Sequence, residues 1–269
     1  MYTRVQNKIV KEKKKWFRRN VPFVGQTTYQ SSTAQWYEPN LVGPRSLAHR
    51  CETGKVIKEL RAFLDKLSSD NYLEFLKNFY QNGLEKYGDS WVYADILTVL
   101  YGISNFLNIE SYLEIGVRRG RSLSIVAGLN PKAKLVGADM WIQAYSGMEN
   151  PGPDFVESEL KKVGFQGEVS WLNGNSRKTI PAYFKKNPNV YFDLITVDGD
   201  HSKIGAAADL RNVIPHLKIG GVLVFDDIVS QEHPYLLKVW EKEVKLTGRF
   251  MTYEFTEVGL GVAFAIKKY

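Results

Sequence analysis

A glycine-rich run with one acidic residue is the first feature of this chain that could do chemistry. In the run Leu113–Ser122, Glu114 lies in an apolar stretch, and Gly116 and Gly120 follow at four-residue spacing. A strand, a glycine-rich turn and a helix allow the backbone to approach a nucleotide-like cofactor closely. The spacing differs from the Gly-x-Gly-x-x-Gly of dinucleotide binders, and a carboxylate at this point would repel a pyrophosphate. The run therefore favours a cofactor that carries a cationic amine here.

Four aspartates form the second group. Asp198 and Asp200 follow one apolar run, and Asp226 and Asp227 follow another. If the two runs are neighbouring parallel strands, these carboxylates converge within about 5 Å and repel one another unless a cation or protons intervene. Hard oxygen ligands select Mg²⁺, Ca²⁺ or Mn²⁺ over zinc. The group predicts a divalent-cation site, with helix capping by Asp200 and Asp227 as the alternative.

The elements that must position these residues alternate along the C-terminal part of the chain. Short apolar runs alternate with helical patterns, which is typical of an α/β fold with a doubly wound parallel sheet. The last two runs are joined by too short a link for a crossover helix, so they should form an antiparallel hairpin. The predicted strands are 112–117, 134–138, 169–172, 192–197, 221–225, 249–255 and 261–267, and the predicted helices are 121–129, 153–163, 177–186, 203–217 and 234–246.

The N-terminal part has a different character, and we expect three regions: a basic, irregular extension over 1–45, a helical cap over 46–110 and a cofactor-binding domain over 111–269. Residues 1–20 contain eight basic side chains and one acidic one, so this segment carries the whole net charge of +7. Such a tail is typically solvated, although it could contact an anionic membrane surface weakly. A single cysteine, Cys51, fits a reducing compartment. With no predicted membrane span, we expect a soluble, cytoplasmic protein.

Three helices are predicted within the cap. Apolar residues recur at helical spacing from Gly54 onward. Asp70 can cap a second helix that ends near Gly83, and Ser90 can cap a third over Trp91–Leu107.

The order of these motifs resembles the class I S-adenosylmethionine (SAM)-dependent methyltransferases over roughly Trp91–Tyr269. The runs Val197-Asp-Gly-Asp-His-Ser202 and Phe225-Asp-Asp-Ile228 look like those of the metal-dependent small-molecule O-methyltransferases. The resemblance implies a Rossmann-like methyltransferase fold with five parallel strands, a C-terminal antiparallel hairpin and an N-terminal helical extension. It also implies that the Glu114 strand lies beside the Phe192 strand, with the site at their carboxyl ends.

The resemblance assigns roles to individual residues. Cofactor binding falls to Glu114, Gly116, Gly120 and Ser122 at the methionine end, to Asp139 at the ribose, and to Asn175 and Ser176 at the adenine. The metal ligands are Asp198, Asp226 and Asp227. His201, with Asp198, would act in catalysis as the base for the acceptor hydroxyl.

Each assignment has an ordinary structural alternative. Gly116 and Gly120 can simply permit a tight turn, and Asp139 can cap a helix or serve a turn. Asn175 and Ser176 can belong to an ordinary turn, and His201 can support a ligand residue or start a helix. Other residues near the motifs have weaker claims: His49, His216, His233, Lys203, Trp141 and Tyr145.

The expected function is SAM-dependent, Mg²⁺-assisted O-methylation of a small hydroxylated molecule such as a sugar, polyketide or phenolic compound. A nucleic-acid methyltransferase is the first alternative, but the chain lacks an Asn/Asp-Pro-Pro-aromatic motif, and its body beyond residue 20 is neutral. A nicotinamide oxidoreductase would need the missing dinucleotide motif. A catalytically inactive cofactor-binding scaffold and a homo-oligomer stay open.

Overall fold

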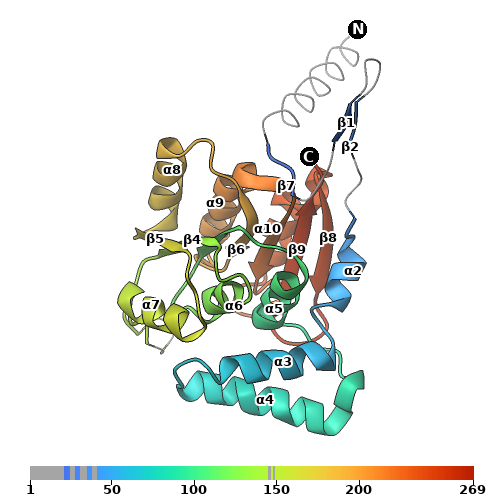
Figure 1. The fold of residues 1–269 in the computed structure, drawn as a ribbon, viewed down its shortest axis with the longest axis vertical. Coiled ribbons are helices and arrows are strands. Elements are labelled where there is room, and N and C mark those ends of the chain that lie inside the picture. The colour runs from blue at the N-terminus through green and yellow to red at the C-terminus, as the bar shows by residue number, and fades with distance from the viewer. Residues whose placement is uncertain (1–20, 25–27, 31–34, 38–40, 145–146, 148) are drawn as a thin grey trace.

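The computed structural model describes residues 21–24, 28–30, 35–37, 41–144, 147 and 149–269. The basic segment 1–20 and Tyr145 lie outside these residues, so the expectations for them stay predictions. A short antiparallel pair, β1 (Thr28–Gln30) and β2 (Gln35–Tyr37), precedes the main body (Figure 1).

A seven-stranded sheet forms the centre of the molecule. Its strand order is β5-β4-β3-β6-β7-β9-β8, in which the first five strands are parallel and β9 runs antiparallel to both β7 and β8 (Figure 1). This is the predicted doubly wound, Rossmann-like methyltransferase fold with its C-terminal hairpin. The strands are β3 (Ser111–Ile115), β4 (Lys134–Asp139), β5 (Glu168–Asn173), β6 (Phe192–Val197), β7 (Leu217–Asp226), β8 (Phe250–Phe255) and β9 (Val262–Lys267).

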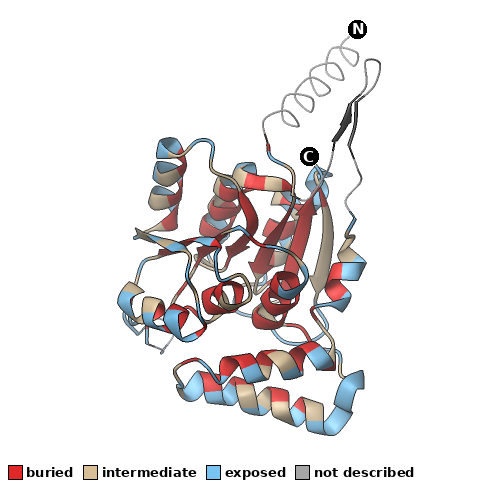
Figure 2. Cartoon of the chain, viewed as in Figure 1, coloured by how far each residue is buried: buried red, intermediate tan, exposed pale blue. Residues whose placement is uncertain are grey.

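Helices cover both faces of the sheet, and each face has its own apolar cluster. Residues of α8, α9 and α10 pack in one cluster, and those of α6 and α7 pack in the other. Every residue of β6 is buried because both faces of this central strand are covered (Figure 2). The helices are α6 (Arg121–Leu129), α7 (Pro153–Lys162), α8 (Ser176–Lys186), α9 (Lys203–Val213) and α10 (Leu236–Glu243).

Among the described residues, four α-helices lie N-terminal to the sheet, and their apolar faces join the cluster that contains α6 and α7. They are α2 (Pro44–His49), α3 (Gly54–Leu64), α4 (Asn71–Tyr87) and α5 (Ile96–Phe106). Asp70 caps α4 as predicted, but the helix continues beyond Gly83. Gly83 lies within the helix because the ring of Trp91 fills the space a side chain would need, 2.1 Å from the position of a Cβ.

The predicted start of the third cap helix is wrong. Helix α5 begins at Ile96 and is capped by Asp95, which forms a capping box with Thr98, whereas Ser90 closes a 3₁₀ turn. The residues between them are extended, because the backbone N–H of Tyr93 donates to the carbonyl of Glu52 at 3.0 Å. This pairing between distant segments overrides the local helical pattern. None of the described helices is long and apolar enough to cross a membrane.

Candidate functional site

The predicted site residues gather at the carboxyl end of the sheet. Strand β3 pairs in parallel with β6, with Ile115 beside Val197, and on its other side with β4. The chain winds outward in opposite directions from β3 and β6, and such a switch point is where open α/β sheets bind ligands. The turn after β3 therefore faces both the end of β4 and the aspartates that follow β6.

Glu114 is fully buried on β3. Its carboxylate accepts hydrogen bonds from the hydroxyl of Tyr112, at 2.7 Å, and from that of Ser122. Burial raises the pKa of Glu114 to about 8, although both hydrogen bonds act in the opposite direction. A carboxyl group held out of water in this way gains from a cationic ligand nearby, which fits the predicted contact with the amine of SAM.

The turn after Glu114 requires glycine at two positions. Gly116 has a φ of +94°, and a Cβ there would lie 1.9 Å from the carbonyl oxygen of Asp198. Gly120 has a φ of +71° and begins α6; a Cβ there would lie 2.4 Å from Val156. Close packing of the β3 turn on the β6 turn thus explains Gly116, and the cofactor role of both glycines stays a prediction.

Replacing Gly116 tests how much depends on this close approach. Gly116→Ala combines a positive φ with a backbone clash, so we expect unfolding to become easier by at least about 3 kcal/mol and SAM binding to be lost. Gly164→Ala is the matched control, because Gly164 has a φ of +81° but open space around the Cβ position. It should cost about 1 to 2 kcal/mol and leave SAM binding intact. Denaturant unfolding and calorimetry measure both effects; equal losses in the two variants would contradict the role of the clash.

Asp139 ends β4 and holds the turns around it. One carboxylate oxygen accepts from the backbone N–H of Arg118 at 2.8 Å, and the other accepts from the N–H of Trp141 at 2.6 Å and from the Asn150 amide at 3.1 Å. Asp139 therefore joins the β3 turn to the β4 turn beside the predicted ribose position. Its contact with the ribose hydroxyls stays a prediction.

Asn175 and Ser176 begin α8. The side chain of Asn175 caps this helix by accepting from the N–H of Arg177 at 3.0 Å, so the capping role is observed directly. Ser176 is buried near Asp209, a carboxyl group whose burial raises its pKa to about 6. The adenine contact of both residues stays a prediction.

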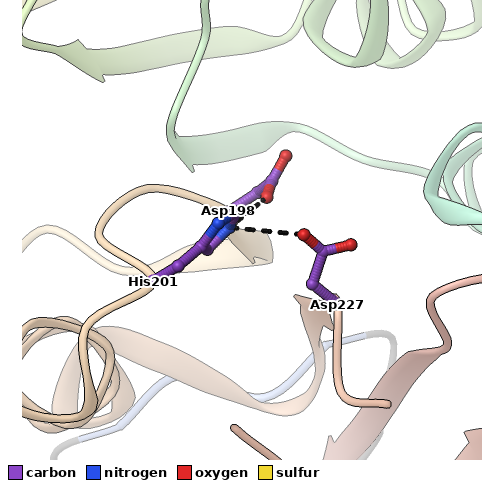
Figure 3. A group of neighbouring side chains, drawn as sticks. All are labelled: Asp198, His201 and Asp227. Atoms are coloured by element: carbon purple, nitrogen blue, oxygen red, sulfur yellow. Dashed lines mark hydrogen bonds and ion pairs between the residues drawn. The ribbon is translucent and has the colours of Figure 1, made fainter. Parts of the chain in front are cut away.

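The second constellation draws three side chains together (Figure 3). The Nε2 atom of His201 lies 3.1 Å from Asp198 Oδ1 and 3.7 Å from Asp227 Oδ2. One potential ligand atom from each residue lies within 4.8 Å of the others, a spacing at which one cation could contact all three. Asp226, the other predicted ligand, is not part of this close group. His201 thus lies where it could contact a bound cation, whereas the sequence predicted for it only the role of a base.

Charge repulsion marks this cluster. Burial and the nearby Asp198 carboxylate raise the pKa of Asp227 to about 6, and burial with the charges of Asp198 and Asp227 raises that of Asp226. Burial lowers the pKa of His201, but its hydrogen bond to Asp198 and the surrounding carboxylates raise it further, so that it lies above its ordinary value. A bound cation would relieve this repulsion, and the carboxylate and imidazole donors fit a divalent ion.

Asp200 is not part of the group of possible metal ligands and instead holds the start of α9. Its carboxylate accepts from the N–H of Ser202 at 2.8 Å, and the side chain of Ser202 caps α9. The Asp200 side chain lies over Gly205, where a Cβ would be 1.9 Å from its carboxylate oxygen.

The other three histidines lie in different surroundings, and one of them is close to the cluster. The ring of His233 lies 5.3 Å from that of His201, so His233 lines the cluster. The Nδ1 of His216 donates to the carbonyl oxygen of Val190 at 2.8 Å, and the ring stacks on Phe184 of α8, away from the aspartate cluster. The sequence predicts His233 only as a weaker candidate, and the loop after Asp227 brings it to the cluster. His49 ends α2, and Lys203 begins α9.

Two tyrosines that sequence reasoning missed also lie near the aspartates. Tyr72 and Tyr93 have raised pKa values, caused first by burial and then by carboxylates that include Asp95 and Asp226. Both come from the N-terminal helical region, which no motif connected with the site.

Comparisons with known proteins agree with this architecture. Residues 113–228 match the family model described as a methyltransferase domain. The solved structure of the O-methyltransferase NovP is similar, with a TM-score of 0.53 and 16% identity over 80% of this chain and 97% of that one. None of the curated proteins compared with the chain matches it.

Two further solved structures are similar at lower scores. CalS11, described as a TDP-rhamnose 3'-O-methyltransferase of calicheamicin biosynthesis, has a TM-score of 0.48 and 20% identity over 79% of this chain and 93% of its own. TomG, an O-methyltransferase from Streptomyces achromogenes solved with SAM, has a TM-score of 0.48 and 18% identity over 64% of this chain and 78% of its own.

The strand order and the glycine-rich turn after β3 thus define a Rossmann-like domain. Residues 113–228, which include this turn and the residues Asp198, His201 and Asp227, match a methyltransferase domain.

Proposed function

We propose that the protein transfers a methyl group from SAM to a hydroxyl group of a small molecule, assisted by a divalent cation, with Mg²⁺ as the first candidate. The observation that carries the proposal is the convergence of Asp198, His201 and Asp227 beside the β3 turn. Bringing these three polar groups together at the edge where ligands bind costs folding free energy. The arrangement therefore favours a role in binding over a purely structural one.

The chain's own residues divide the work. The Glu114 carboxylate and the Gly116–Gly120 turn hold the methionine end of SAM, which directs its methyl group toward the ends of β6 and β7. Methyl transfer is an in-line displacement, so its rate depends on holding the acceptor oxygen in line with the methyl group. The Nε2 of His201 donates to Asp198 Oδ1 at 3.1 Å, which orients the imidazole, and His201 accepts the hydroxyl proton on its other ring nitrogen.

Asp198, Asp227 and either Asp226 or His201 would hold the cation. A divalent ion supplies Lewis acidity, which lowers the pKa of an acceptor hydroxyl. If His201 is a ligand, another group must take the proton, and His233 is the nearest candidate by its 5.3 Å ring distance. Mn²⁺ binding followed by electron paramagnetic resonance in His201→Gln distinguishes the roles: unchanged Mn²⁺ affinity supports the base, and a tenfold or larger loss, as ligand removal causes, supports the ligand.

The proposed acceptor is a small molecule and not a nucleic acid, and the proposed location is the cytoplasm. Beyond residue 20 the acidic and basic side chains balance, which leaves little drive for binding a polyanion. Cys51 is a free, buried thiol, in keeping with a reducing compartment.

Two measurements test the function in sequence. Calorimetry with SAM and with S-adenosylhomocysteine (SAH) should detect binding of both, and failure to bind either would contradict the proposal. Radiolabelled SAM with Mg²⁺ and a panel of catechols, phenols, sugars and a duplex oligonucleotide should then label a hydroxylated small molecule. Label in the oligonucleotide alone would instead favour the nucleic-acid alternative.

A further inference from the structure

The aspartate before helix α4 connects that helix to the cofactor turn. Asp70 Oδ1 accepts from the N–H of Leu73 at 2.8 Å and so caps α4. Asp70 Oδ2 accepts from Arg119 Nε at 2.7 Å and from Arg121 Nη2. Arg119 lies in the turn after β3, and Arg121 is the first residue of α6. A single carboxylate therefore joins the start of α4 to the glycine-rich turn.

These ion pairs are well shielded from water. The side chains of Arg119 and Arg121 are 8% and 11% exposed, and that of Asp70 is 24% exposed. Arg119 also lies over the ring of Phe155, with 4.5 Å between its guanidinium carbon and the ring centroid. Arg119 also pairs with the exposed Glu149 at 2.7 Å. Loss of the Asp70 carboxylate nevertheless takes the partner of the buried Arg121 away, so the connection holds one geometry more firmly than a surface salt bridge would.

Arg121 also contacts the ring of Tyr72. Its guanidinium carbon lies 5.3 Å from the centroid of the Tyr72 ring, which belongs to the first turn of α4. The pKa of the Tyr72 hydroxyl is raised first by burial and then by the charges of Asp95, Asp226 and Asp198, so this hydroxyl lies within electrostatic range of the proposed metal ligands. The start of α4 thus borders the space where an acceptor must meet the methyl group.

The other side of this acceptor space is formed by the segment around Tyr93 and by the link between β8 and β9. The hydroxyl of Tyr93 lies 3.8 Å from the position of a Cβ on Gly259, in the link between β8 and β9. That link is held to the residues after Asp227 by hydrogen bonds from Ile228 and Val229 to the carbonyls of Gly261 and Leu260. The segments near Tyr93 are therefore held by hydrogen bonds that do not involve Asp70, whereas the position of Tyr72 depends on Asp70.

We propose that Asp70 is a positioning residue that couples SAM binding at the Gly116–Gly120 turn to the placement of Tyr72 beside the acceptor. The inference rests on the proposed function. The turn adopts positive φ at Arg118, Gly116 and Gly120, and a bound cofactor restricts its conformations. Because Asp70 fixes α4 to this turn, the same restriction stabilises the first turn of α4, where a helix otherwise frays. The acceptor side is then complete only when the cofactor is bound.

The test uses SAH alone as the probe, so it needs no knowledge of the acceptor. In Asp70→Asn the amide oxygen can still cap α4, but a neutral group no longer pairs with two guanidinium groups. Hydrogen–deuterium exchange should show SAH slowing exchange over 71–78 at least about fivefold in the wild type and less than about twofold in the variant. SAH affinity should fall about fivefold in parallel, as reciprocal coupling requires.

Three further variants sharpen the test. Asp70→Glu restores the charge and should recover part of the coupling. Arg119→Gln with Arg121→Gln removes the same link but leaves the cap untouched, so it replaces Asp70→Asn should that variant not fold. Arg211→Gln breaks an exposed pair with Glu243 elsewhere and should behave as the wild type.

The outcomes separate this inference from the proposed function. SAH binding that protects α4 equally in the wild type and Asp70→Asn, or that protects α4 in neither, overturns the coupling and leaves methyl transfer standing. A wild-type chain that does not bind SAH contradicts the proposed function itself and the coupling with it.

Discussion

Asp227→Asn should lower methyl transfer at least about a hundredfold while leaving the affinity for SAM within about twofold of the wild type. The reason is the position of Asp227, whose carboxylate lies opposite His201 directly after the end of β7, whereas the cofactor turn follows β3. Turnover of the acceptor found in the labelling screen measures the first effect, and calorimetry measures the second. Chelation of the wild-type protein with EDTA should reproduce the loss, and Mg²⁺ should restore it.

The same variant should be more stable than the wild type when no metal is present. The folded-state pKa of Asp227 is raised from 3.8 to about 6, so the folded protein binds the proton more tightly than the unfolded chain. Stability therefore falls as the pH rises from about 4 to 6, and the penalty is complete at pH 8. Asp227→Asn removes this penalty, which is about 1 to 3 kcal/mol in size.

Thermal unfolding at pH 8 provides a readout that does not depend on the acceptor. Mg²⁺ should raise the melting temperature of the wild type, because the cation relieves the repulsion, and should not raise that of Asp227→Asn. Asp89→Asn, at an exposed carboxylate remote from the strand ends, is the matched control and should respond as the wild type. A wild-type chain that is active in EDTA and indifferent to Mg²⁺ would rule out the metal.

The sheet could be predicted from sequence because its signals are local. The apolar run 192–197 coincides with β6, since a strand covered on both faces must be apolar throughout. Helix α6 begins and ends as predicted between Gly120 and Asn130. The carboxyl ends of β3 and β6 then bring the Asp198 turn against Gly116, as the strand order requires.

The misplaced start of α5 and the site residues that the sequence missed or ranked low have a different cause. The Tyr93–Glu52 hydrogen bond, the Arg121–Asp70 pair and the approach of His233 to His201 all join segments that are distant in the chain. Local periodicity contains no information on such contacts. The predicted ligand set took Asp226 from the motif, whereas the close group contains His201, because side-chain direction at the strand ends follows from backbone geometry such as the φ of +59° at Asp227.

Glu114→Gln should abolish the pH dependence of SAM binding and weaken binding most at pH 8. In the free protein the pKa of Glu114 is about 8, so at pH 7 the buried carboxyl group is mostly protonated. The amine of SAM is cationic and favours the carboxylate, which lowers the pKa of Glu114 in the complex. Binding at pH 7 must therefore release close to one proton, and the affinity should rise up to about tenfold per pH unit from pH 6 until it levels near pH 8.

Calorimetry in two buffers of different ionisation enthalpy measures the released proton directly. The wild type should give a buffer-dependent heat at pH 7, and Glu114→Gln should give none, because a neutral amide has no proton to lose. Glu168→Gln, at an exposed position at the start of β5, should match the wild type. If the wild-type protein binds SAM without releasing a proton, then Glu114 does not contact the amine. Its buried hydrogen bonds with Tyr112 and Ser122 would then serve only to fix the β3 turn, and the glycines alone would carry the approach to the cofactor.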